Sequence, residues 1–291
     1  MVKRKLEKNA KKIDLFLRKF ILKQKKTELI KPMKYGVLSG GKKIRSSIII
    51  SSGKIFNLAA DSLLNICGAV ECIHSYSLIH DDLPCMDNDK VRRGKPSTHV
   101  KFGEATAVLA GNSLLTLAFE MITDKSYKIS NLSKNELIRN LSRFSGHNGI
   151  AGGQELDLRY EKKKKNLNQI IEMQKKKTGK LFNFCCLAPA LIAKTSSIEK
   201  RRMSLIGEDI GLLFQLADDL LDITGSKKIT GKTINKDKKK GKSTLVNLIG
   251  VKRTYEFAND LKTSILNKLN KYGAKANDLK KIIEFILARN F

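Results

Sequence analysis

The sequence Ile79-His80-Asp81-Asp82-Leu83-Pro84-Cys85-Met86-Asp87-Asn88-Asp89 decides how the rest of the chain is interpreted. It places four carboxylates within nine residues of a 291-residue chain whose formal net charge is +29. Like charges this close repel each other unless a group of opposite sign lies between them. Asp beside Pro and Asn is also typical of an ordinary helix end and turn, so this stretch alone leaves both interpretations open.

A second acidic cluster favours the metal interpretation. Asp218-Asp219-Leu220-Leu221-Asp222 lies inside an apolar run from Ile210 to Ile223, where a solvated face is not expected. On a helix, residues three and four apart share a face, so Asp218 and Asp222 project together with Asp219 beside them. Carboxylates grouped on an otherwise apolar helix require a cation. Magnesium prefers oxygen ligands and completes its shell with substrate phosphates, so the two clusters predict a diphosphate held through metal ions.

The hydrophobic pattern is helical along nearly the whole chain, and no alternating strand pattern occurs. The predicted helices cover 13–21, a stretch that follows Arg45, 61–82, 105–122, 135–149, 170–193 with an interruption at Lys177-Thr178-Gly179, 204–224, 243–271 and 276–289. Residues 226–242 hold eight lysines and are expected to form a mobile basic loop. We therefore predict an all-α protein, a large single-domain helical bundle over residues 1–291 around a central apolar cavity.

The cysteine pattern and the apolar segments predict a cytoplasmic location. The five cysteines are odd in number and show no C-x-x-C spacing, which argues against a disulfide framework and against a zinc site. We expect no membrane span, because no apolar stretch reaches the length of one; Phe184 to Ala193 is the longest candidate. Charged residues interrupt the first apolar segment, so a signal peptide is not expected.

The basic excess raises the question of a nucleic-acid partner. The chain has 57 Lys and Arg against 28 Asp and Glu. The charge is spread along the sequence, aromatic residues make up only 6%, and no helix-turn-helix or zinc-finger pattern occurs. We therefore expect no specific nucleic-acid partner and keep a basic nucleic-acid-binding helical protein as a distant alternative.

Two short basic segments are candidates for binding anions. Gly40-Gly41-Lys42 precedes a helix, where free backbone N–H groups attract anions, and Arg45 adds a charge nearby. Arg92 and Arg93 lie in a turn that follows the first acidic cluster. By contrast, Gly241-Lys242-Ser243-Thr244 resembles the end of a nucleotide-binding P-loop but lacks the required glycine and the preceding strand, so we reject that interpretation.

Taken together, these motifs resemble the trans-polyprenyl diphosphate synthase family, and within it the bacterial farnesyl diphosphate synthase branch. The resemblance runs from about Leu38 to Leu248. The matching stretches are Gly40-Gly41-Lys42-Lys43-Ile44-Arg45, the run from Glu71 to Gly94, Gly152-Gly153-Gln154 with Asp157, Lys177-Thr178-Gly179, Phe214-Gln215 with Asp218, Asp219 and Asp222, and Gly231-Lys232.

The resemblance implies an activity and a role for each matching residue. The activity is the condensation of isopentenyl diphosphate with dimethylallyl or geranyl diphosphate by a homodimer. Three magnesium ions would be held by Asp81, Asp82, Asp87, Asp218 and Asp222, with Gln154 and Asp157 in support. The allylic diphosphate would contact Arg92, Lys177 and Lys232, and isopentenyl diphosphate would contact Lys42, Arg45, His74 and Arg93. Phe214, Gln215 and Thr178 would lie beside the reacting carbons. The residues implied to be catalytic are Lys177, Thr178 and Gln215.

Product length depends on the residues before the first acidic cluster. Tyr76 lies five residues before Asp81, about 7.5 Å along a helix, and the resemblance links an aromatic residue here, beside Ser77, to a fifteen-carbon product. A geranylgeranyl diphosphate synthase is the alternative. A terpene cyclase would share the metal chemistry but would not need Lys42, Arg45 and His74. Two departures from the family pattern are Ser46, where Pro is frequent and only a change in helix initiation is expected, and Asn235, where Gly is frequent.

Overall fold

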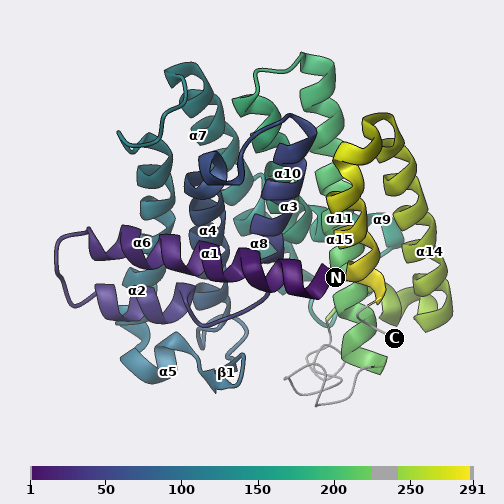
Figure 1. Ribbon diagram of the computed structural model, residues 1–291. Coiled ribbons are helices and arrows are strands. Elements are labelled where there is room, and N and C mark those ends of the chain that lie inside the picture. Colours follow the sequence, from purple (N-terminus) through teal and green to yellow (C-terminus); the bar gives the residue numbers. More distant parts are fainter. Residues whose placement is uncertain (1, 225–241, 289–291) are drawn as a thin grey trace. The chain divides into compact units, whose positions relative to one another are not determined.

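The computed structural model describes residues 2–224 and 242–288, and most of them are helical (Figure 1). The prediction of an all-α protein is confirmed. The Cα positions divide the chain into two compact units, one formed by Met1–Gly53 and Leu58–Ile138 and the other by Lys54–Asn57 and Arg139–Phe291. The single-domain organisation, the central cavity and the mobility of the lysine-rich loop stay predictions; of that loop, only Lys242 lies within the described residues.

The first unit is built around one helix that is buried on nearly all sides. Its elements are α1 (Val2–Leu22), α2 (Ile30–Val37), most of α3 (Ile44–Ile55), η1 (Ala60–Leu63), α4 (Leu64–Asp81), the strands β1 (Val91–Arg92) and β2 (Lys95–Pro96), α5 (Thr98–Phe102), α6 (Glu104–Thr123) and the start of α7 (Asn131–Ser145). Helix α4 packs mainly against α6 and also contacts α1 and α2. It has almost no polar face because its neighbours cover it.

The expectation about apolar stretches was wrong. Residues Ala60–Asp81 and Glu104–Thr123 form two helices that are long and apolar enough to cross a membrane, by length and composition alone. Core helices pass the same test, and 67% of the apolar window of the first of these helices is buried inside the protein. The apolar character of α4 is therefore accounted for by its packing within the unit.

The second unit is arranged around the long helix α11. Its elements are α8 (Ile150–Tyr160), α9 (Leu167–Gln174), the π-helix η2 (Lys175–Gly179), α10 (Lys180–Ile192), α11 (Ser197–Thr224), α14 (Leu245–Leu269), η3 (Asn270–Ala276) and α15 (Asn277–Ala288). Helix α11 packs against α10, α14 and α15. The interruption predicted at Lys177-Thr178-Gly179 is present, and it takes the form of a π-helical turn between two α-helices. Such turns are rare and are frequent at functional sites.

A small hairpin was not predicted from the sequence. Strands β1 and β2 pair antiparallel with Val91 opposite Pro96 and Arg92 opposite Lys95. The intervening residues Arg93 and Gly94 have φ angles of 53° and 74°. A two-residue turn with both φ angles positive matches the right-handed twist of a hairpin. Strands of two residues are too short to produce an alternating pattern, which explains why only a turn was expected here.

Candidate active site

The first acidic cluster lies at the C-terminal end of α4. Asp81 is the last residue of α4 and Asp82 caps it. The following turn folds back, because the backbone N–H of Asp87 donates to the carbonyl of Asp81 at 2.8 Å and that of Asp89 donates to the carbonyl of Asp82 at 3.1 Å. A helix C-terminus carries partial negative charge, so carboxylates gathered there are unfavourable without cations. The carboxylates at the end of α4 are therefore stable only with cations close by.

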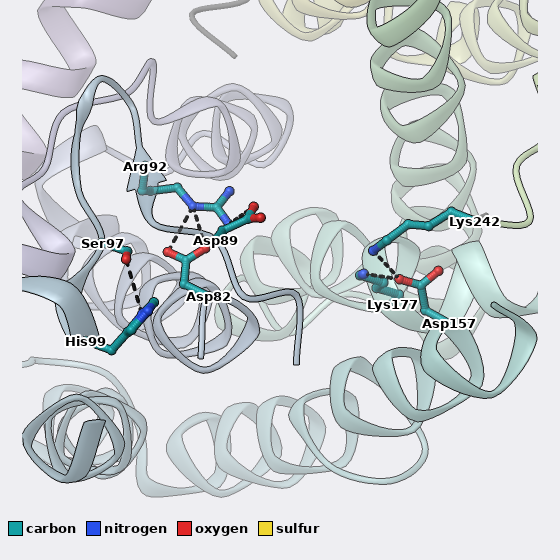
Figure 2. Close-up of polar contacts among 8 residues, drawn as sticks. All are labelled: Asp82, Asp89, Arg92, Ser97, His99, Asp157, Lys177 and Lys242. Atoms are coloured by element: carbon teal, nitrogen blue, oxygen red, sulfur yellow. Dashed lines mark hydrogen bonds and ion pairs between the residues drawn. The ribbon is translucent and has the colours of Figure 1, made fainter. Parts of the chain in front are cut away.

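Arg92 of the hairpin supplies one of these cations (Figure 2). Its Nε donates to both carboxylate oxygens of Asp82 at 3.1 Å, its Nη2 also contacts Asp82, and Asp89 lies 3.8 Å from that nitrogen. Burial alone would lower the pKa of Arg92, but its bonds to Asp82 raise that pKa above its ordinary value. A predicted metal ligand and a predicted phosphate ligand thus bond to each other. If both residues act as predicted, substrate and metal binding would require this partly buried pair to exchange partners.

The four cationic or imidazole residues predicted for the second substrate come from three segments of the first unit. Nη1 of Arg45 lies 3.2 Å from Nε2 of His74. Arg93 reaches from the hairpin to the glycine loop, where it donates to the carbonyl of Gly40 and, at 3.3 Å, to Oγ of Ser39. A Cβ on Gly41 would lie 2.8 Å from Cζ of Arg93, so a side chain there would displace this guanidinium, and the φ of +107° at Gly41 also favours glycine. Lys42 lies exposed on the same loop.

The contact with Arg45 fixes the protonation of His74. A guanidinium can only donate, so Nε2 of His74 accepts and the proton of the neutral ring is on Nδ1. Desolvation, together with the charges of Arg45 and Arg93, lowers the pKa of His74 well below 6.5. The imidazole is therefore neutral at neutral pH.

This protonation state predicts a flat titration for His74. We expect its ring signals in NMR spectra to show the Nδ1–H tautomer and no midpoint between pH 6 and 8, with His74→Gln used to assign them. As the pH falls below 6.5, the unfolded chain takes up a proton that the folded chain refuses, so the free energy of unfolding should decrease. A midpoint anywhere between pH 6 and 8 would contradict the prediction.

In the second unit, Asp157 of α8 binds two lysines (Figure 2). Its Oδ2 accepts from Nζ of Lys177 at 2.6 Å and from Nζ of Lys242 at 3.0 Å. Burial would raise the pKa of Asp157, but the two ammonium groups lower it below the ordinary value. Gly153 makes the approach possible, since a Cβ there would lie 2.1 Å from the backbone nitrogen of Lys177.

Lys242 is the residue that the sequence interpretation missed. It belongs to the Gly-Lys-Ser-Thr segment that was rejected as part of a P-loop. The P-loop interpretation remains rejected on the sequence, because Lys236 stands where the required glycine would be; within the described residues, residues 242–244 lead directly into α14. Its lysine nevertheless reaches the same carboxylate as Lys177. The local signal, a glycine and a lysine before a helix, was available in the sequence.

The second acidic cluster separates into two kinds of carboxylate. Asp218 and Asp222 lie on one partly exposed side of α11, whereas Asp219 is 3% exposed. Oδ1 of Asp219 accepts from Nε2 of Gln215 at 2.8 Å, and its Oδ2 accepts from Nε2 of Gln174 at 2.8 Å. Asp219 therefore holds two amides in place, a role that the sequence did not predict.

The side chains predicted to lie beside the reacting carbons form a chain of contacts. Oγ1 of Thr178, in the π-helix, donates to Oε1 of Gln215 at 2.8 Å. The oxygen of Gln215 therefore accepts from Thr178, and its orientation is fixed at both ends of the amide. Phe214 packs on Phe182 with ring centroids 5.0 Å apart. These residues come from η2, α10 and α11, which pack together.

The donor set fits magnesium in its chemistry. No group of three or more His, Cys, Asp or Glu lies close enough to hold a metal by itself among the described residues. Magnesium does not need such a group, since it binds one or two carboxylates and takes its other ligands from water and phosphate. Gln154 adds an observation of its own, because both polar atoms of its buried amide have no hydrogen-bond partner in the structure. Lys232, Gly231 and Asn235 lie outside the described residues.

Comparisons with characterised proteins agree with these motifs. The polyprenyl synthetase family model matches residues 26–286. The farnesyl diphosphate synthase of Escherichia coli strain K12 is 38% identical over 296 residues, which cover 98% of each chain. That of Buchnera aphidicola subsp. Acyrthosiphon pisum strain APS is 44% identical over 72% of this chain and 74% of its own.

Solved structures give the same result. A geranyltransferase from Legionella pneumophila has a TM-score of 0.89 and 30% identity, covering 100% of this chain and 97% of its own. A geranyltransferase from Helicobacter pylori, complexed with magnesium and isoprenyl diphosphate, has a TM-score of 0.85 and 31% identity, covering 99% and 96%. The resemblance inferred from the motifs is confirmed. The chain belongs to the polyprenyl synthetase family.

Proposed function

We propose that this protein is a farnesyl diphosphate synthase, which condenses isopentenyl diphosphate with dimethylallyl and then geranyl diphosphate. The observation that carries the proposal is that the chain has two distinct sets of cationic and imidazole side chains, each of which would bind one diphosphate. One contains Arg45, His74 and Arg93, and the other contains Lys177 and Lys242. A terpene cyclase would need only one such set. The E. coli and Buchnera relatives carry the same name as the proposed activity.

Different basic residues would bind each of the two substrates. Arg92, Lys177 and Lys242, with Lys232, would bind the allylic diphosphate; Lys42, Arg45, His74 and Arg93 would bind isopentenyl diphosphate. Magnesium, held by Asp81, Asp82, Asp87, Asp218 and Asp222, would supply positive charge that makes diphosphate a better leaving group. We propose three ions per site. The lysines and arginines add preorganised charge where negative charge develops on the leaving oxygen.

The chemistry at carbon needs no protein base. When the allylic C–O bond breaks, its electron pair leaves with the diphosphate and an allylic cation remains. The double bond of isopentenyl diphosphate attacks this cation, and the departed diphosphate takes the proton that is then lost. Thr178 and Gln215 would place oxygens beside the cation, with Asp219 and Gln174 fixing the amide. Phe214 would help to exclude water, which would otherwise quench the cation.

The assembly and the setting follow from the same proposal. We infer a homodimer in the cytoplasm that acts on small diphosphate substrates. The distant nucleic-acid alternative gains no support, since the relatives described above carry the names of prenyl-transferring enzymes.

The test is a product assay with the full chain. Isopentenyl diphosphate is incubated with dimethylallyl, geranyl or farnesyl diphosphate, with magnesium or with a chelator, and product length is measured by chromatography. We expect a fifteen-carbon diphosphate from the first two primers, and no product after chelation. Cyclised hydrocarbons, a nuclease-like activity, or turnover that survives chelation would overturn the proposal.

Replacing Lys242 should affect the two substrates differently, which replacing a surface lysine should not do. Lys242→Met should raise the KM for the allylic diphosphate about tenfold, because one charge-assisted contact to phosphate is lost, while the KM for isopentenyl diphosphate changes less than twofold. Lys268→Met is the matched control, since Lys268 pairs with Asp209 at 2.7 Å on the surface. Equal effects of the two variants would show that Lys242 acts only through general charge.

A further inference from the structure

Two adjacent lysines in the glycine loop have opposite environments. Lys42 is exposed, whereas the side chain of Lys43 is 3% exposed. Lys43 has a φ angle of +44°, a left-handed conformation that is uncommon for a residue with a side chain. Such a conformation persists only where surrounding contacts hold it. The contacts of Lys43 should therefore matter to the shape of the loop.

The Lys43 ammonium ties the loop to three helices of the first unit. Its Nζ donates to the carbonyl of Val37, the last residue of α2, at 2.8 Å. It lies 3.7 Å from Oδ1 of Asp14 on α1 and 3.5 Å from Oε2 of Glu71 on α4. A buried ammonium is stable only with such partners. The buried side chain of Lys43 therefore links the glycine loop to α1, α2 and α4.

Glu71 holds the chain on both sides of Arg45. It is 3% exposed, and while its Oε2 faces Lys43, its Oε1 accepts from Oγ of Ser46 at 2.8 Å. Ser46 was expected only to change helix initiation, because proline is frequent at this position in the family. The structure gives it a buried hydrogen bond that proline could not make, so this contact distinguishes the present chain from the common pattern.

The same helix face carries the partner of Arg45. Glu71 and His74 are three residues apart on α4 and share a face. Two neighbouring contacts therefore join the start of α3 to α4, Ser46 to Glu71 and Arg45 to His74. The negative charge of Glu71 also offsets the repulsion among the cations of the loop.

We propose that Lys43, Ser46 and Glu71 form a positioning cluster for the isopentenyl diphosphate subsite. The cluster does not touch the substrate. It holds the backbone from residue 43 to 46 so that Arg45 stays against His74 and Lys42 stays on the outer side of the loop. The inference rests on the proposed function, because it concerns one of the two substrates of that reaction.

The experiment is a comparison of the two KM values in variants of the cluster. Glu71→Gln keeps the side-chain shape and removes the charge; Ser46→Ala removes one hydroxyl and leaves a helix-compatible residue. We expect the KM for isopentenyl diphosphate to rise about tenfold in Glu71→Gln and about threefold in Ser46→Ala. The KM for geranyl diphosphate should stay within twofold of the wild-type value in both variants.

The control is a buried hydrogen bond elsewhere on the same helix. Asn65 of α4 donates to the carbonyl of Met121 at 2.8 Å, so Asn65→Ala loosens α4 without altering the loop. It should lower Tm and leave both KM values within twofold. The inference is overturned if the cluster variants leave the KM for isopentenyl diphosphate within twofold, or raise both KM values equally. If Glu71→Gln does not fold, Ser46→Ala alone decides. A wild-type protein that forms no prenyl product would overturn the proposed function and the inference together, whereas an active wild type with unchanged variants overturns the inference alone.

Discussion

Asp81→Asn is expected to lower kcat/KM about 10³-fold, the loss typical of removing one group that stabilises charge on a leaving group. Asp81 ends α4 and is partly exposed, so its replacement should leave Tm nearly unchanged. The measurement is steady-state kinetics with geranyl diphosphate at several magnesium concentrations, because loss of a metal ligand should also raise the magnesium concentration that half-saturates the enzyme.

Asp82→Asn separates the metal role from the structural one. We expect a comparable loss of activity but also a lower Tm, because Asp82 is 2% exposed and holds the partly buried Arg92 guanidinium. Breaking one side of such an ion pair costs about 3 kcal/mol, which corresponds to roughly 5 °C in a chain of this size. Asp61→Asn, at an exposed pair with Lys12, is the control and should change neither quantity. Activity of Asp81→Asn within tenfold of wild type would contradict a metal role for this cluster.

Tyr76→Ala is expected to change the main product from fifteen to twenty or more carbons. The Tyr76 side chain is 9% exposed and lies edge-on to His80, with ring centroids 5.7 Å apart. Burial, with a contribution from Asp81, raises the pKa of Tyr76 to about 12, so the phenol stays neutral at physiological pH. A neutral ring about 7.5 Å before Asp81 suits the end of an apolar pocket. Removing it would leave room for another isoprene unit.

Tyr76→Phe is the matched control for product length. It keeps the ring and removes the hydroxyl, so the product should remain fifteen carbons long, while Tyr76→Ala lengthens it. Products are read by chromatography after dephosphorylation. Unchanged length in Tyr76→Ala would remove Tyr76 as the residue that ends elongation. A wild-type protein that already yields twenty carbons would favour the geranylgeranyl alternative.

Much of the helical fold could be predicted because its periodicity is local. The helix that ends at Asp81, the helix that carries Asp218 and Asp222, and the interruption at residues 177–179 all follow from spacing within a few turns. What could not be predicted was the type of that interruption, since a π-turn differs from an α-turn in which carbonyl accepts each N–H. The strands on either side of Arg93 and Gly94 could not be predicted either, because two residues are too few to show an alternating pattern.

The contacts of the candidate site were harder to predict than its residues. The pairing of Arg92 with Asp82 depends on a hairpin that reverses the chain, and the inward direction of Lys43 depends on a left-handed backbone. Asp219 and Asp218 are adjacent and alike in sequence, yet only the neighbours across α9 and α11 give Asp219 a structural role. Residue type and spacing therefore identify the candidate site residues, whereas their individual roles depend on tertiary contacts.

The π-helical turn bears on how this enzyme can change over evolutionary time. Three consecutive lysines occupy it, and each meets a different acid: Lys175 lies near Glu208, Lys176 near Glu172 and Lys177 near Asp157. A π-helical turn contains one residue more than an α-helical turn, so deleting one lysine would restore an α-helical turn and keep the following side chains on their faces. Such a deletion would leave two lysines for three acids, so its cost would fall on the ion pairs of this turn and not on the direction of α10.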